Sequence, residues 1–103
     1  MVQNTVIEYR SFRRSALRFM PDDHICGLID YLSELPKSGK ECSILKGLRA
    51  IDWPRKELGG EPVATIGYYF FSKRHPVHLI SCFQIHEKNI ANKILELAFR
   101  EFE

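Results

Sequence analysis

Lysine and arginine side chains that could hold phosphate groups gather in two parts of the chain. The early group consists of Arg10, Arg13, Arg14 and Arg18. The middle group consists of Lys37, Lys40, Lys46, Arg49, Arg55 and Lys56. Phosphate affinity depends on the local density of Lys and Arg, so either group could meet a nucleic-acid backbone. An ordinary solvated face explains the same pattern equally well, and both interpretations stay open.

The histidines and cysteines form no metal or nucleophile motif. His75 and His78 are spaced as H-x-x-H on an expected turn, which lacks both the i, i+4 geometry of a helical zinc motif and a third ligand. Cys26, Cys42 and Cys82 are odd in number and contain no C-x-x-C pair, which argues against a disulfide framework and against a zinc knuckle. Cys82 falls in an expected strand without a histidine partner in sequence. We therefore expect no metal and no cofactor.

Length and composition predict a single domain over residues 1–103, which buries roughly 60–65% of its unfolded surface. The amino terminus lacks a signal pattern, and no apolar run approaches the ~20 residues that a membrane helix needs. The net charge is +2, from 15 Lys and Arg against 13 Asp and Glu, and does not by itself favour any partner. These features predict a soluble, cytoplasmic protein with no membrane contact.

Three β-rich runs must position the middle basic group, over residues 47–53, 63–71 and 77–83. Their links are short, which predicts an antiparallel meander rather than a parallel sheet. The first link contains Pro54 and the pair Gly59 and Gly60, residues that interrupt a strand.

The first third of the chain predicts a strand and two helices. Residues 5–9 favour a strand that pairs with the meander, and residues 10–20 favour an amphipathic helix. A second helix opens at Pro21 and stops at Pro36, and a last helix begins at or near His86. The predicted fold class is α+β, with an N-terminal strand and a helical hairpin packed on a small antiparallel β-sheet, followed by a C-terminal helix.

In element order and spacing, from Val6 to about Ile90, the chain resembles the RelE/ParE superfamily of bacterial toxins, particularly its HigB-like branch. The motifs that carry the resemblance are Gly47, Leu48 and Arg49 with Ile51 and Trp53 following, the pair Gly59 and Gly60, the aromatic strand Ile66, Gly67, Tyr68, Tyr69 and Phe70, and residues 83–87. The resemblance implies a RelE-like fold and the toxin of a type II toxin–antitoxin pair. Such toxins are ribosome-dependent, metal-independent mRNA endoribonucleases (mRNA interferases) that inhibit translation, and an antitoxin encoded by an adjacent gene counters them.

Departures from the family pattern fall where family members carry basic or polar side chains. Ala50 and Asp52 stand where members usually have two more basic residues after G-L-R. Thr65 takes the place of the arginine in K-R-G-G-x-R, and three extra residues precede Tyr68. Ile85 and His86 replace the lysine and asparagine of Y-x-K-N-E.

RNA cleavage by attack of the 2′-OH requires a proton acceptor, positive charge at the phosphate, and a proton donor for the departing 5′ oxygen. His86 can exchange protons near neutrality, whereas the asparagine it replaces cannot. We therefore expect Arg49 and His86 to be catalytic, through charge stabilisation and proton transfer. The expected RNA-binding residues are Lys46, Arg55, Lys56, Lys73 and Arg74, with Tyr69 stacking on a base.

Other roles stay open for these residues. Arg55 and Lys56 could only solubilise the loop, Arg49 could stack on Trp53 or pair with Asp52, and His86 could cap the last helix. The missing basic side chains also motivate a second hypothesis, a catalytically impaired RelE-fold protein that binds an antitoxin-like partner or joins a DNA-bound repressor complex. A third possibility, a fold outside the superfamily, would leave residues 6–9 unpaired with the meander.

Overall fold

The computed structural model describes residues 4–42 and 45–102 and confirms the α+β class. In chain order its elements are β1 (Val6–Glu8), α1 (Arg10–Ala16), α2 (Asp22–Glu34), β2 (Lys40–Glu41), β3 (Leu48–Trp53), the short 3-10 helix η1 (Lys56–Leu58), β4 (Ala64–Tyr69), β5 (Val77–Gln84) and α3 (Ile90–Phe102). Over the described residues, no helix combines the length and the apolarity that crossing a bilayer requires.

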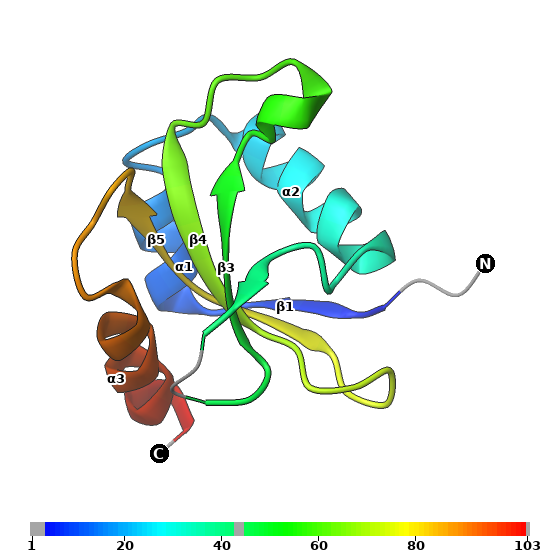
Figure 1. Cartoon of the computed structure of the whole chain (residues 1–103), viewed down its shortest axis with the longest axis vertical. Helices are drawn as coiled ribbons and strands as arrows, with labels where there is room; N and C mark the ends of the chain where they lie inside the picture. Colours follow the sequence, from blue (N-terminus) through cyan, green and yellow to red (C-terminus); the bar gives the residue numbers. More distant parts are fainter. Residues whose placement is uncertain (1–3, 43–44, 103) are drawn as a thin grey trace.

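The described strands form one sheet in the order β1-β5-β4-β3-β2 (Figure 1). The meander is antiparallel as expected, because short links join β3 to β4 and β4 to β5. The expectation of a wholly antiparallel sheet is wrong, however, since β1 runs parallel to β5, with Val6 opposite Val77. Two helices separate β1 from the meander, so no short link fixes its direction. The sheet is therefore mixed.

Two helix boundaries differ from expectation for local reasons. The helix expected over residues 10–20 ends at Ala16, and Arg18 and Phe19 then donate to carbonyls three residues back, at 3.1 and 3.0 Å. This tightening leads into Pro21, and the residue before a proline disfavours helical backbone. The last helix begins at Ile90 rather than near His86, because His86 and Asn89 adopt φ values of 67° and 57° that interrupt a right-handed helix.

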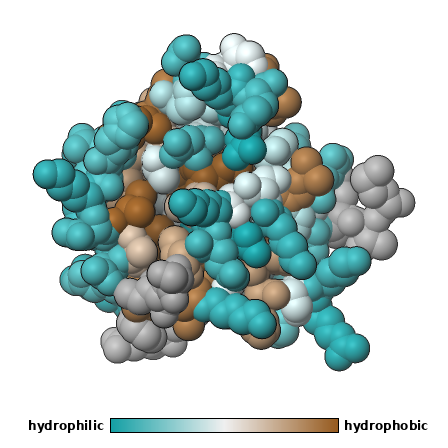
Figure 2. Space-filling model, viewed as in Figure 1, coloured by the Kyte–Doolittle hydropathy of each residue, from teal (hydrophilic) through white to brown (hydrophobic). Residues whose placement is uncertain are grey.

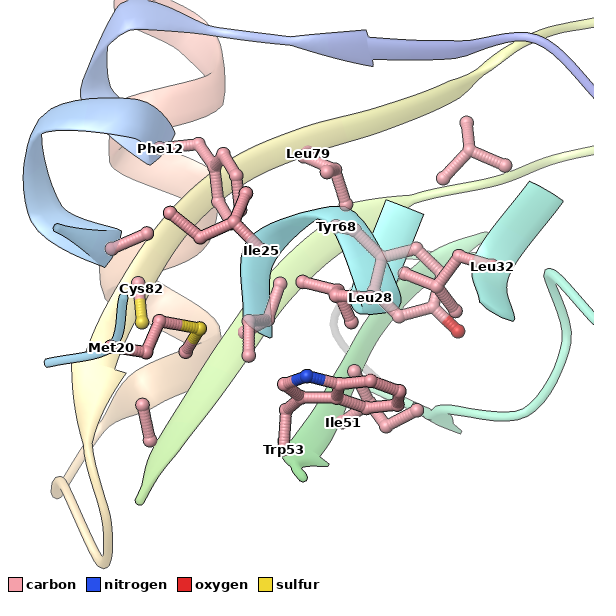
Figure 3. Close-up of a cluster of buried hydrophobic side chains, with 14 of the residues drawn as sticks. Phe12, Met20, Ile25, Leu28, Leu32, Ile51, Trp53, Tyr68, Leu79 and Cys82 are labelled. Atoms are coloured by element: carbon pink, nitrogen blue, oxygen red, sulfur yellow. The ribbon is translucent and has the colours of Figure 1, made fainter. Parts of the chain in front are cut away.

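The helical hairpin covers one face of the sheet. Phe12 and Ala16 of α1 and the apolar side of α2 pack against residues of β3, β4 and β5 in the main buried cluster. Figure 3 shows Trp53 and Ile51 of β3 beside Leu28 of α2, with Tyr68 reaching toward Leu32. Two helices side by side on one sheet face is the packing that the sequence predicts.

Helix α3 covers part of the opposite face, where Ile94 packs with Leu48 and Ile80. A glycine makes this approach possible, because a Cβ built at Gly67 would lie 2.4 Å from Cγ1 of Ile94. Asp52, near the end of β3, and both residues of the short edge strand β2 stay exposed beside these helical layers. Figure 1 shows how α1, α2 and α3 lie around the sheet.

Candidate nucleic-acid interface

A cavity of about 470 Å³ lies where β2, the end of β3 and the loop after β3 meet. Its charged lining residues are Lys40, Asp52, Arg55, Lys56 and Glu57. Because β2 has only two residues and its pairing with β3 stops at Lys40 opposite Ala50, the sheet edge is open beside Asp52. The cavity is thus a basic notch at an unpaired sheet edge.

The loop that walls this cavity is held by its own backbone features. The Trp53–Pro54 peptide is cis, and Gly59 ends η1 with a φ of 86° that other residues rarely adopt. Gly60 lies against Pro54, since a Cβ at Gly60 would be 2.7 Å from the Cβ of that proline. The two glycines therefore shape the loop that presents Arg55 and Lys56.

The positively charged side chains that line the cavity differ in whether they already have a carboxylate partner. Arg55 Nε lies 3.3 Å from Oε2 of Glu57, so the positive charge of Arg55 is partly neutralised within the loop. Lys40 and Lys56 are exposed, and within residues 4–42 and 45–102 neither forms an ion pair. Thr65 donates a hydrogen bond of 2.7 Å to Oδ1 of Asp52 and holds that carboxylate in place. The two lysines are the cations most available to an anionic ligand.

Arg49 does not line this cavity. Strand alternation places it on the helical-hairpin side of β3 with Ile51 and Trp53, and its side chain is only 14% exposed. Its guanidinium donates to the carbonyl oxygen of Gly39 at 2.9 Å and lies 3.8 Å from Glu41. Arg49 therefore ties the segment before β2 to the sheet, which is a structural role.

Tyr68, which is paired with Arg49 across β3 and β4, fixes the same segment. Its hydroxyl donates to the carbonyl of Pro36 at 2.7 Å and accepts from the backbone N–H of Gly39 at 2.8 Å. Burial raises the pKa of Tyr68 to about 12, so the hydroxyl stays protonated and keeps its donor role. Gly39 is needed for this contact, because a Cβ there would lie 2.5 Å from the tyrosine oxygen. The segment that leads into Lys40 is thus anchored by Tyr68 and Arg49.

His86 lies away from Arg49. It is exposed, in the turn between β5 and α3. The register places Arg49 opposite Tyr68, and Gln84 opposite Ala64. Ala64 comes four residues before Tyr68 in β4, a separation of roughly 13 Å along the strand direction, and His86 lies beyond Gln84. The structure does not bring together the two residues expected to act jointly in catalysis.

The remaining expected RNA-binding residues lie at the end of the sheet where β3 begins and β4 ends. Lys46 precedes β3, while Lys73 and Arg74 occupy the turn between β4 and β5, and all three are exposed. β3 spans six residues, so this end lies roughly 17 Å from Arg55 and Lys56. Tyr69 is half-buried with the cluster under α3, which leaves it little free surface for stacking. The expected RNA-binding residues thus form two separate groups.

A second cavity, of about 720 Å³, adjoins the end of the sheet where β4 ends. It lies between the end of α2 and the β4–β5 turn, and its lining includes Leu35, Lys37, Phe70 and Lys73.

No cluster of three or more His, Cys, Asp or Glu side chains that could hold a metal ion occurs in the part of the chain that the structure describes. Nδ1 of His75 lies 2.9 Å from the Ser72 hydroxyl, and Nδ1 of His78 lies 2.8 Å from the Tyr9 hydroxyl. The H-x-x-H pair is therefore engaged in local hydrogen bonds.

Sequence patterns place Lys40 in the middle basic group and Asp52 beside Arg49, but they do not predict that Lys40 and Asp52 line one cavity. A strand that ends opposite Ala50 and a carboxylate beside a basic loop are visible only once the pairing of β2 with β3 is known.

The sequence matches no protein-family model and is not significantly similar to any curated protein.

Proposed function

We propose that this protein is a cytoplasmic toxin of the RelE superfamily, HigB-like branch, which cleaves mRNA on the ribosome and is neutralised by an antitoxin. The element order supports the proposal: a strand, a helical hairpin and a three-strand meander follow one another, and β1 pairs with the meander. The observation that carries it is the basic cavity at the end of β3, whose lining brings Lys40, Arg55 and Lys56 together with the carboxylates of Asp52 and Glu57.

In this proposal the cavity residues replace the family's missing basic positions. Lys40 and Lys56 bind the phosphates and stabilise the charge that develops on the attacked phosphate. The carboxylate of Asp52, held by Thr65, accepts the proton of the 2′-OH as the P–O2′ bond forms. As the P–O5′ bond breaks, the ammonium group of one of the two lysines gives a proton to the departing 5′ oxygen. Arg49 acts as a positioning residue, because it holds the segment that leads into Lys40.

A second candidate function is RNA or partner binding without cleavage. The specific observation in its favour is that the guanidinium of Arg49 is occupied by the backbone of the neighbouring segment, while His86 lies far from it. A protein of this kind would use Lys40 and Lys56 for binding and would need no proton acceptor.

Induced expression in bacteria tests both candidates through growth. We expect the wild-type protein to arrest growth and the double variant Lys40→Ala, Lys56→Ala to relieve the arrest. The matched control is Lys88→Ala with Arg100→Ala, which removes the same charge from exposed positions outside the cavity.

Asp52→Asn separates cleavage from binding, since it keeps the size of the side chain and removes the proton acceptor. Loss of a general base costs on the order of 100- to 10,000-fold in rate, so a nuclease would lose its toxicity. Arrest that survives Asp52→Asn but not the lysine variant would favour the binding role. Full toxicity of the lysine variant, at equal protein level, would defeat the cavity as the functional site.

A further inference from the structure

An aromatic side chain stands exposed among cations at the end of the sheet opposite the cavity. Phe71 follows β4, is 47% exposed and lies outside both buried clusters. The ammonium group of Lys46 sits 5.8 Å from the centre of its ring, and the His75 ring meets it edge-on at 6.4 Å and 86°. A large apolar ring is therefore held at the surface without a core to bury it.

The cations around this ring are not neutralised. Lys46, Lys73 and Arg74 are exposed, and none of them forms an ion pair within residues 4–42 and 45–102. Glu41 approaches this region, but its carboxylate accepts a hydrogen bond from the Gly47 backbone at 2.8 Å. Glu34 lines the neighbouring cavity together with Lys73. The immediate surroundings of Phe71 are thus cationic.

The backbone that presents Phe71 is well fixed. The His75 backbone N–H donates to the Ser72 carbonyl at 3.0 Å, and the Ser72 hydroxyl bonds Nδ1 of His75 at 2.9 Å. The N–H of Phe70 donates to the Gly47 carbonyl at 2.9 Å, which joins this turn to the segment that carries Lys46. The backbone segments that carry Phe71 and Lys46 are therefore held together before any ligand binds.

We propose that this basic aromatic turn, formed by Lys46, Phe71, Lys73, Arg74 and His75, is a binding site for single-stranded RNA. A base stacks on the exposed face of Phe71, and the flanking phosphates lie on the three cations, a combination that single-stranded nucleic acids recognise. The inference rests on the proposed function, because RNA is the substrate there. The turn lies roughly 17 Å along β3 from the basic cavity, a span that a few extended nucleotides can cover.

A short single-stranded RNA that carries 2-aminopurine tests the inference, because stacking quenches the fluorescence of this base. We expect the wild-type protein to bind and quench the probe. Phe71→Ala should weaken binding roughly 5- to 150-fold and abolish quenching, since stacking on one aromatic side chain contributes that much. Phe71→Trp should restore both. The control is Leu17→Ala, which shortens another exposed apolar side chain, one that is 54% exposed at the end of α1.

Salt dependence tests the cations separately. For single strands each phosphate contact adds about 0.7 to the slope of log affinity against log salt, so Lys73→Ala with Arg74→Ala should lower the slope by roughly 1.4. Unchanged binding and quenching in Phe71→Ala, in protein with an unaltered circular dichroism spectrum, would overturn the inference. Wild-type protein that binds an acidic peptide but not the RNA would overturn it as well.

This assay contains no ribosomes and measures no cleavage, so its outcome is separate from that of the proposed function. Probe stacking that depends on Phe71, in a protein that cuts no mRNA, would keep this site and defeat the endonuclease. Ribosome-dependent cutting with RNA binding indifferent to Phe71 would do the reverse.

Discussion

Two polar side chains, Arg49 and Tyr68, reach from the sheet to the segment that leads into Lys40. Tyr68 is fully buried and Arg49 is mostly buried, and each forms hydrogen bonds with backbone groups between Pro36 and Gly39. Arg49 also keeps one atom, Nε, buried without a partner in the described part of the chain. An arginine in this setting contributes to stability and to the position of Lys40 rather than to an exposed ligand site.

Arg49→Ala should therefore lower the free energy of unfolding by roughly 1–3 kcal/mol, because the carbonyl of Gly39 loses its donor in a partly buried place. Arg49→Lys should recover part of the loss, since lysine keeps the charge but not the planar fork. Urea denaturation measures both changes. Unaltered stability of Arg49→Ala together with lost RNA affinity would return Arg49 to the RNA site.

The stability of the protein should fall at alkaline pH. Burial raises the pKa of Tyr68 from 10.0 to about 12 and that of Cys82 from 9.0 to about 12. The folded pKa values lie above the unfolded ones, so from about pH 9 to about 12 the unfolded chain releases protons that the folded chain retains. The free energy of unfolding is therefore unaffected by these groups below that window and declines through it.

Denaturant titrations across this window check the prediction. Tyr68→Phe should flatten the decline above about pH 10, and Cys82→Ala should flatten it from about pH 9. A decline that is the same in both variants as in the wild-type protein would show that other groups cause it.

Helix α3 approaches the sheet closely where Ile94 lies against Gly67 of β4. Gly67→Ala should cost roughly 1–3 kcal/mol of stability by overpacking, and Ile94→Ala roughly 2–5 kcal/mol by leaving a cavity. The double variant should cost less than the sum, because the shortened Ile94 makes room for the new methyl group.

Gly59→Ala is the matched control for this cycle. It strains the backbone at a φ of 86° but its methyl group meets no atom within 4 Å, so its cost should simply add to that of Ile94→Ala. Thermal or urea denaturation gives all the values. Strict additivity of Gly67→Ala with Ile94→Ala would contradict the packing of α3 described above.

Sequence patterns predict the elements well where the signal is local. The apolar repeat between Pro21 and Pro36 gives α2 almost to its ends, at Asp22–Glu34, because periodicity and the two prolines act within the segment. Strand β2 is not predictable from sequence, because two residues are too few to show an alternating pattern and form a strand only by pairing with β3. The direction of β1 likewise depends on a partner far away in the chain.

The candidate site is less predictable than the elements that build it. Lys46 and Arg55 are close in sequence, yet β3 runs between them and places them at opposite ends. The strand alternation that puts Arg49 beside Ile51 and Trp53 was available in the sequence and indicates its inward direction. The left-handed backbone of His86 cannot be predicted from the sequence, because a positive φ in a non-glycine residue depends on the surrounding turn.

Over the whole molecule, the net charge of +2 hides an uneven distribution. The early basic group is partly neutralised, because Arg13 pairs with both Glu8 and Asp22. Among the described residues, Lys40 and Lys56 of the basic cavity and Lys46, Lys73 and Arg74 of the basic aromatic turn form no ion pair. Figure 2 shows a mainly hydrophilic face over the sheet, broken by smaller hydrophobic areas. A strand of RNA that met both sites would run along the length of β3.

Cleavage of mRNA in a cell-free translation reaction, mapped by primer extension with and without ribosomes, tests the proposed function most directly. We predict cuts only when ribosomes are present. They should be lost in Asp52→Asn, reduced in the double variant Lys40→Ala, Lys56→Ala, and kept in the Lys88→Ala, Arg100→Ala control. Intact mRNA in a reaction with translating ribosomes and folded wild-type protein would contradict the endonuclease proposal.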